Sequence, residues 1–239
     1  MKQVKLIFIS LIMWSISPML QSCDKNDDDN DRQQDTTFND SSIKCPDSNH
    51  PHMIDLGLPS GTKWACCNVG ASAPEKYGNQ YAWGEVQPKS MYDWDTYRWG
   101  SVQDKLTKYN TRSDHGTLDG IITLDASDDA ATVNWGAPWR MPSVTEIEEL
   151  LNNTTSNWTK EYGVCGLKIS GSNGCSIFLP AAGGHWYSDL YYSGLRGYYW
   201  SSTLFLDGPY DAYYLYFNYS DVYWYNSNRL SGQSVRPVR

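Results

Sequence analysis

The sequence predicts an α+β domain made of short strands, one or two helices and long loops. Only one stretch, residues 142–151, has the pattern of a clear helix. From about Asn49 the chain is dense in Gly, Pro, Asn and Trp, with short apolar runs and many turn signals. Near the C-terminal end, apolar and polar side chains alternate with a period of two. Together these observations favour one α+β domain over residues 49–239, with loops long enough to carry a binding site.

The N-terminal segment, residues 1–22, is predicted to be a lipoprotein signal peptide. Two lysines precede an apolar run over residues 6–20, which is too short to span a membrane comfortably. The run ends in Leu20-Gln21-Ser22-Cys23, which resembles the lipobox of bacterial lipoproteins. That resemblance implies that Cys23 carries a lipid anchor. An uncleaved anchor helix, or a secretory signal with a chance cysteine, stays open as the alternative.

Residues 23–48 are predicted to form an acidic, flexible tether. Asp24 begins a run rich in Asp and Asn, and polar residues continue to about Ser48, so the segment cannot bury a core. Acidic residues after a lipidated cysteine resemble export tags that send lipoproteins to the outer face of the outer membrane. We therefore expect a lipid-anchored protein of the outer membrane, exposed on the cell surface. A plain spacer is the alternative interpretation.

Charge and cysteine content exclude some classes of partner. The net charge of −8 and only 19 Lys and Arg argue against nucleic-acid binding. Five cysteines remain after Cys23, an odd number, and no two of them have zinc-site spacing. We therefore predict no metal and no cofactor. The disulfide pairing of these cysteines stays open, and a short loop closed by Cys165 and Cys175 is one alternative. The remaining three are Cys45, Cys66 and Cys67.

The helix over residues 142–151 begins with a capping box. Ser143 is followed three residues later by Glu146, and Ile147, Leu150 and Leu151 form an i, i+3, i+4 stripe. A packed surface helix follows from this pattern. A second, shorter helix is predicted over residues 127–133, with Ser127 as its cap.

Two strands are predicted near the C-terminal end, over residues 213–219 and 221–225. Leu215 and Phe217 alternate with tyrosines in the first, and Val222 and Trp224 alternate with Asp and Tyr in the second. We expect the aliphatic and Trp side chains on the inner face and the tyrosines mostly on the outer face.

The C-terminal third also differs in composition. No Lys, Glu or Met occurs after Lys168, whereas 12 of the 18 tyrosines lie between residues 187 and 225. Exposed Tyr among Asn, Ser, Asp and Gly is typical of an antibody paratope, and an exposed aromatic patch usually marks an interaction site. A tyrosine-rich core and a sugar-binding face are the alternatives. The predicted ligand-binding residues are His185, Tyr187, Asp189, Tyr191, Phe205, Tyr210, Asp211, Tyr214, Tyr216, Tyr219, Asp221, Tyr223, Tyr225, Asn226 and Asn228.

A series of short phrases across nearly the whole domain resembles one family. They are, in chain order, Asp55-Leu56-Gly57-Leu58-Pro59-Ser60-Gly61-Thr62-Lys63-Trp64-Ala65, Asn68-Val69-Gly70-Ala71, Tyr81-Ala82-Trp83-Gly84-Glu85, Trp135-Gly136, Trp139-Arg140-Met141-Pro142, Leu179-Pro180-Ala181-Ala182-Gly183, Tyr199-Trp200-Ser201-Ser202-Thr203 and Ser234-Val235-Arg236-Pro237-Val238. The chain resembles the Fibrobacter-type major paralogous domain lipoproteins of gut-dwelling Gram-negative bacteria. That resemblance implies a C-type-lectin-like fold of the kind found in formylglycine-generating enzymes.

The residue types at the predicted binding positions add a second resemblance. Random replacement of both adenines in an AAC or AAT codon yields Asn, Tyr, Ser, Asp, His, Phe and Gly among others, and never Lys, Glu, Met, Gln or Trp. The predicted binding residues, with Gly208, Ser227 and Ser231, obey that limit. The chain in this respect is similar to the variable proteins of diversity-generating retroelements, which implies a hypervariable ligand-binding region over about residues 183–239. The residues expected to be fixed are Trp200, Ser201, Ser202, Ala212, Leu215, Phe217, Val222, Trp224, Arg229, Gly232 and Gln233.

No catalytic site is predicted. The four histidines have no spacing that supports a Ser/His/Asp site, and Asp128-Asp129 or Asp93 with Asp95 are more typical of solvated turns than of calcium ligands. Formylglycine-generating enzymes need a cysteine pair near the C-terminus, whereas this chain has no cysteine after Cys175. We therefore expect a non-enzymatic surface receptor or adhesin that binds a protein or glycan. An invariant pilus-tip or envelope adhesin is the alternative, and a related oxidase a more remote one.

Overall fold

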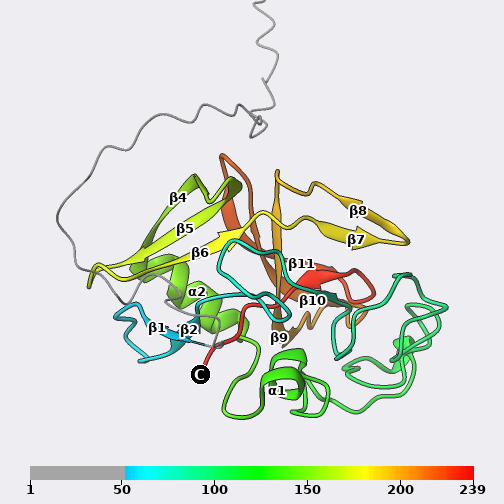
Figure 1. The fold of residues 1–239 in the computed structure, drawn as a ribbon. Helices are drawn as coiled ribbons and strands as arrows, with labels where there is room; N and C mark the ends of the chain where they lie inside the picture. The colour runs from blue at the N-terminus through cyan, green and yellow to red at the C-terminus, as the bar shows by residue number, and fades with distance from the viewer. Residues whose placement is uncertain (1–51) are drawn as a thin grey trace, which may run out of the picture.

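The computed structural model describes residues 52–239. The signal peptide, Cys23, the tether and Cys45 lie outside these residues. Strands predominate within the described residues, and the helices are few and short, which agrees with the coarse α+β prediction (Figure 1).

A five-stranded sheet forms the centre of the domain. In spatial order its strands are β11 (Val222–Asn228), β10 (Asp211–Phe217), β9 (Gly197–Leu204), β12 (Gln233–Ser234) and β3 (Gln80–Tyr81). Neighbouring strands are antiparallel except for β12 and β9, which run parallel. Both predicted C-terminal strands are present as β10 and β11, and β11 lies at one edge.

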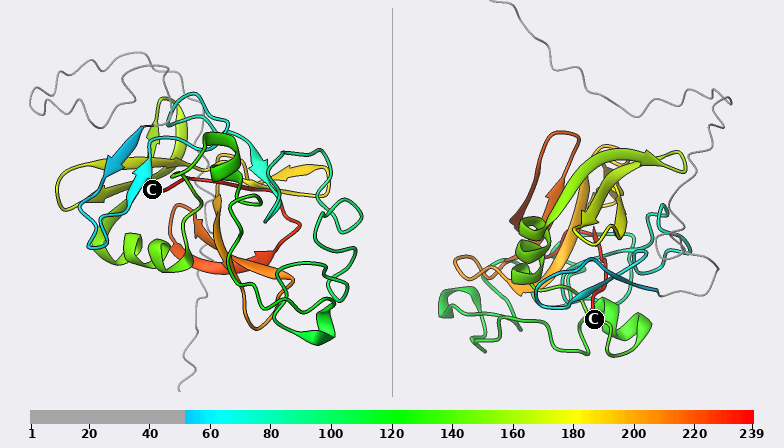
Figure 2. Two further views of the ribbon diagram at one scale, coloured as in Figure 1. Left: turned by 90° about the horizontal axis from the view of Figure 1, so that it is seen from below. Right: turned by 90° about the vertical axis from the view of Figure 1, so that its left-hand side faces the viewer.

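Three smaller elements surround this sheet (Figure 1). They are the antiparallel sheet of β4 (Thr154–Glu161), β5 (Val164–Gly171) and β6 (Ser176–Pro180), the hairpin of β7 (Gly184–Trp186) and β8 (Asp189–Tyr191), and the pair of β1 (Met53–Asp55) and β2 (Lys63–Ala65). The last residues of the chain bond to β2, because Lys63 and Arg239 exchange two backbone hydrogen bonds of 3.0 and 2.9 Å. Both views in Figure 2 place the C-terminus beside β1 and β2.

Helix α2 (Val144–Asn153) covers one face of the β9–β10–β11 region. Its capping box is present as predicted: Ser143 accepts from the backbone N–H of Glu146, and Glu146 accepts from the backbone N–H of Ser143. Ile147 and Leu150 are buried in a core cluster that also contains Leu215. The helix thus packs on one face of these strands, and other elements of the domain pack on the opposite face.

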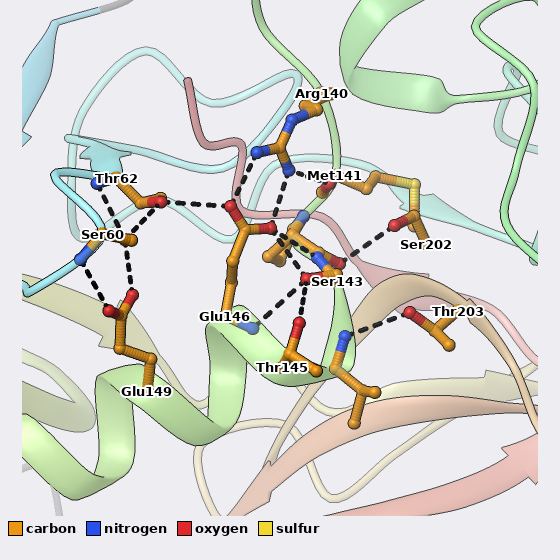
Figure 3. A network of polar contacts seen from close by, with 12 residues as sticks. Ser60, Thr62, Arg140, Met141, Ser143, Thr145, Glu146, Glu149, Ser202 and Thr203 are labelled. Atoms are coloured by element: carbon orange, nitrogen blue, oxygen red, sulfur yellow. Dashed lines mark hydrogen bonds and ion pairs between the residues drawn. The ribbon is translucent and has the colours of Figure 1, made fainter.

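Glu146 links the start of α2 to the segment just before the helix and to Thr62, which is distant in sequence (Figure 3). Its carboxylate accepts two hydrogen bonds from Arg140, of 2.7 and 2.6 Å, and one from the Thr62 hydroxyl at 3.1 Å. Burial opposes ionisation of Glu146, but the bonds from Arg140 and Ser143 outweigh it and lower its pKa to about 2.

We expect this carboxylate to stabilise the domain in a pH-dependent way. The depressed pKa contributes stability that is present above the unfolded value of about 4.3 and is lost as the pH falls towards 2. Replacing Glu146 by Gln should therefore cost about 1–2 kcal/mol at pH 7, a figure reduced because Arg140 is partly exposed to solvent. Urea unfolding of both proteins between pH 7 and pH 2.5 measures this difference. A difference that stays constant over that range would contradict the assignment.

The second helix, α1, begins later than predicted. It spans Ala130–Trp135, and its cap is Asp129 rather than Ser127. The Asp129 carboxylate accepts from the backbone N–H groups of Ala131 and Thr132, and also from that of Met141, at 2.8 Å. The carboxylate that caps the helix therefore also fastens the segment that leads into α2. A short 3₁₀ helix, Ser113–His115, lies in the long loop before α1.

Buried aromatic residues and one arginine fill the space between the sheet and the loops. Trp83 and Trp200 are fully buried, and their indole N–H groups donate to the backbone carbonyls of Ser201 and Tyr81, both at 2.8 Å. Arg229 is also fully buried. Four tryptophans of the phrases that resemble the family, Trp64, Trp83, Trp139 and Trp200, are core residues, and Trp135 is partly buried.

The possible loop closure between Cys165 and Cys175 is not formed. Cys165 is disulfide-bonded, and Cys175 is not its partner.

Candidate functional site

The two faces of β9, β10 and β11 differ in chemistry. Leu215 pairs across the strands with Trp224, and both lie on the α2 face. Tyr214 pairs with Tyr225, and Tyr216 with Tyr223, so these four rings share the opposite face. The predicted division of side chains between the faces is therefore present.

Exposure does not follow the predicted division. Tyr214 and Tyr216 are buried, with exposed fractions of only 8% and 7%, so the expectation that they lie open to solvent is wrong. Trp224, expected inside, is 39% exposed because it lies on the edge strand. Burial also raises the pKa of the Tyr214 hydroxyl well above its usual range.

The rings opposite α2 form one continuous chain of contacts. Trp186 of β7 contacts Tyr198 of β9 at a centroid distance of 5.4 Å, Tyr198 contacts Tyr216 at 5.5 Å, and Tyr216 contacts Tyr223 at 4.8 Å. Tyr191 extends the chain at the Trp186 end, and Tyr225 extends it beyond Tyr223. We call this surface the aromatic face; it consists of Trp186, Tyr191, Tyr198, Tyr214, Tyr216, Tyr223 and Tyr225.

The aromatic face is buried at its centre and open at its ends. Tyr191, Tyr223 and Tyr225 are 43%, 46% and 59% exposed, whereas Tyr198, Tyr214 and Tyr216 are covered. Many of the ring contacts are edge-to-face, including Trp186–Tyr198 with an interplanar angle of 83° and Tyr223–Tyr225 with 89°. The buried rings therefore support the exposed ones in fixed orientations.

A single cation of the C-terminal third reaches this face within the described residues. Arg196 lies over the ring of Tyr192 at 3.8 Å, and its positive charge partly offsets the rise that burial causes in the pKa of Tyr198. The other interior arginines of that third, Arg229 and Arg236, are buried and bond to carbonyl groups elsewhere. The charge of Arg196 thus lies beside an otherwise neutral aromatic surface.

Other predicted site residues surround the β7–β8 hairpin and the β10–β11 turn. Tyr187 and Asp189 are exposed in the β7–β8 hairpin, and Tyr219 and Asp221 are exposed around the β10–β11 turn. His185 is half-buried, stacked on Tyr92 at 5.2 Å and hydrogen-bonded to Gln80. Burial lowers the pKa of His185, which favours its neutral form. His185 is therefore held in place by the scaffold rather than presented to solvent.

The remaining predicted residues do not join the aromatic face. Asp211 and Asn226 belong to the α2 face, where the Asn226 amide donates to Asp211 at 2.8 Å. Phe205 contacts Tyr213, and Tyr210 contacts His115. Asn228 pairs with Asp211 and supports the next turn by accepting from Ser231. These residues, with the buried Gly208 and Ser231, form no common surface with Tyr223.

Sequence reasoning missed four residues of the site region: Trp186, Tyr192, Arg196 and Tyr198. Trp186 precedes a tyrosine at a sharp turn, and Tyr187 and Tyr192 both have positive φ, of 55° and 58°. The i, i+4 spacing of Tyr192 and Arg196 was a visible signal for a cation–π pair. Tyr198 has the same strand parity as Trp200, which the alternation within β9 could have shown.

Comparisons with known proteins identify no relative. No family model, curated protein or solved structure matches the chain. Across residues 52–239 no three His, Cys, Asp or Glu side chains gather as a metal site would require. No helix in that part of the chain is long and apolar enough to cross a membrane.

Proposed function

We propose that the protein is a lipid-anchored, surface-displayed receptor or adhesin whose aromatic face binds a protein or glycan partner. One observation carries the proposal: exposed Tyr191, Tyr223 and Tyr225 are joined through buried rings into a single surface. An exposed aromatic patch of this kind usually marks an interaction site.

The packing of the rings favours binding on energetic grounds. A ring that is already fixed by its neighbours loses little conformational freedom when a partner binds, so more of the contact energy appears as affinity. Tyrosine also offers a hydroxyl at the edge of a large apolar surface. Ser188, Asn218 and Ser220 lie near the exposed rings in the same hairpins and supply small polar groups. Such a combination suits recognition of a protein surface or of a sugar.

We further propose that adenine-directed mutagenesis diversifies this face. Tyr191, Tyr223 and Tyr225 are all accessible from Asn codons, and all are exposed. Trp200 and Gln233, which that mechanism cannot produce, are fully buried. Trp186 also cannot arise in this way, and we assign it as a fixed support within the face. The buried Tyr214 and Tyr216 are exceptions to a simple division between a variable surface and a constant core.

The domain is further proposed to have a C-type-lectin-like fold. Three features support this assignment: the end of the chain lies against β2, two short helices flank the central sheet, and a long loop region precedes α1. In such a domain the loops and strands far from the chain ends would carry the ligand site.

Replacing the three exposed rings together tests the proposed function. We expect the Tyr191→Ser, Tyr223→Ser, Tyr225→Ser variant to lose at least about 100-fold in affinity, because several interface aromatics each contribute about 1–2 kcal/mol or more. The labelled mature protein would first be screened on arrays of glycans and of purified cell-surface proteins, and the affinity of each hit would then be measured by surface plasmon resonance.

Leu118 provides the control, since its side chain is 58% exposed and lies outside every core cluster and ring contact. Leu118→Ser should leave affinity within about two-fold, as expected of a surface residue outside the site. Unchanged binding of every hit by the triple variant, with an unchanged unfolding midpoint, would refute the proposal.

A further inference from the structure

Backbone groups along one side of the long edge strand of the central sheet have no strand partner within residues 52–239. β11 pairs with β10 on one side, and no strand of the described residues lies on the other. Two backbone hydrogen bonds flank the β10–β11 ladder, from Asn218 to Asp221 at 2.9 Å and from Arg229 to Tyr210 at 3.0 Å. They establish which residues of β11 direct their backbone groups at β10 and which direct them away. Tyr223 and Tyr225 therefore direct their N–H and C=O groups at β10, and the residues between them direct theirs outward.

The outward groups belong to Val222, Trp224 and Asn226. No backbone hydrogen bond in the described part of the chain reaches them on that side. Asn228 also points outward, but its carbonyl is occupied by the N–H of Ser231 at 3.0 Å. The open positions are thus three alternate residues centred on Trp224.

Protein edge strands are usually protected against pairing, and β11 lacks that protection. Lysine, proline, a bulge or an inward-pointing charge are the common devices. The sequence of β11, Val222-Tyr223-Trp224-Tyr225-Asn226-Ser227-Asn228, contains no charged residue and no proline, and its register with β10 is unbroken. The other edge strand, β3, has only two residues. β11 is therefore the edge of this sheet most suited to adding a strand.

We propose that β11 pairs antiparallel with β11 of a second copy of this chain, about a twofold axis at Trp224. This register pairs Val222 with Asn226 of the other copy, and Trp224 with its own counterpart. All three outward residues then find a partner, with about six new backbone hydrogen bonds. Because the strand is uncharged, two copies meet there without like-charge contacts, and the self-complementary spacing satisfies the requirement of a twofold interface.

The dimer would enlarge the aromatic face, which is a consequence beyond the proposed function. A twofold axis perpendicular to the sheet keeps the same face of both copies on the same side. Tyr223 of one copy then lies opposite Tyr225 of the other, so four exposed tyrosines adjoin across the new strand pair. Trp224, which is 39% exposed in the single chain, packs against its counterpart on the α2 side.

Sedimentation velocity of the full-length chain in detergent tests the pairing. The wild-type protein should form dimers in a concentration-dependent way. Asn226→Pro removes one outward N–H from each copy without removing a bond to β10, so it should weaken dimerisation at least about ten-fold relative to Asn226→Ala. Both variants lose the bond to Asp211, so that loss cancels in the comparison.

Disulfide trapping tests the register and does not depend on the proline variant. Trp224→Cys places the two new cysteines about 5.5 Å apart between Cα atoms, within the range that a disulfide spans. Asn226→Cys lies on the same face but would sit about 14 Å from its counterpart. Oxidation should therefore give a covalent dimer for Trp224→Cys, above the wild-type background, and none for Asn226→Cys.

Monomers at all concentrations up to about 100 μM, equal weakening by both Asn226 variants, or trapping through position 226 would overturn the proposal. A monomeric protein that still binds its partner through Tyr191, Tyr223 and Tyr225 would leave the proposed function intact. The two claims can thus fail separately.

Discussion

Replacing Arg229 by Met is expected to destabilise the domain by about 4 kcal/mol. The guanidinium is fully buried and donates to the Tyr97 hydroxyl at 2.9 Å and to the carbonyls of Lys108 and Pro209 at 3.0 and 2.8 Å. It also donates to the Tyr109 carbonyl at 3.0 Å. Methionine fills similar space but satisfies none of these acceptors, and a buried acceptor without a partner costs about 1 kcal/mol or more.

Arg196→Met is the matched control for that experiment. Arg196 is only half-buried and lies over Tyr192 at the surface, so the same substitution should cost less than about 1 kcal/mol. Guanidinium chloride unfolding of the two variants and the wild type measures both values. Equal destabilisation by both substitutions would show that Arg229 does not fasten the loops to the sheet as its contacts indicate.

Gly183→Ala is expected to have the second large effect, about 3 kcal/mol, and to disturb the site itself. Gly183 has φ of +71°, where residues with a side chain are strained. A Cβ there would also overlap the carbonyl oxygen of Tyr191 and lie 2.8 Å from the backbone nitrogen of Ser193. The β7–β8 hairpin would have to move, and it carries Trp186 and Tyr191 of the aromatic face.

Substitution of Gly194 is the control that tests backbone strain without the steric overlap. Its φ of +78° is similar, but a Cβ would meet nothing within 4 Å. Gly194→Ala should therefore cost only about 1 kcal/mol and leave tryptophan fluorescence near the native spectrum. If both alanine variants lost the same stability, close packing between Gly183 and the hairpin would not be the cause.

Local sequence rules predicted the elements whose determinants lie within a few residues. The capping box of Ser143 and Glu146 and the apolar stripe of α2 are local, and the helix begins where they indicate. The β10 and β11 strands follow from alternation in the same way. The predicted start of α1 is wrong, since the cap is Asp129. The Asp129 carboxylate also accepts from the backbone N–H of Met141, twelve residues away, and no local pattern reveals that contact.

The burial of the site depends on tertiary contacts that alternation does not encode. A period of two separates Tyr214 and Tyr216 from Leu215, but it does not show that the β7–β8 hairpin and neighbouring loops cover the tyrosine face. For the same reason alternation predicts Trp224 on the inner face but not its exposure to solvent, which arises because α2 leaves the edge strand partly uncovered. Composition indicated the region of the chain that contains the aromatic face, and the strand registers show which of its residues share one surface.

The most direct test of the central claim is to sequence the 3′ end of the gene in many near-identical copies. A diversified binding face over a fixed scaffold predicts that amino-acid replacements recur at exposed positions such as Tyr191, Tyr223 and Tyr225. Trp186, Trp200 and Gln233 should be unchanged, and the nucleotide differences should fall only where a template repeat has adenine. Replacements spread evenly over exposed and buried positions, or an invariant C-terminal region in every copy, would contradict it.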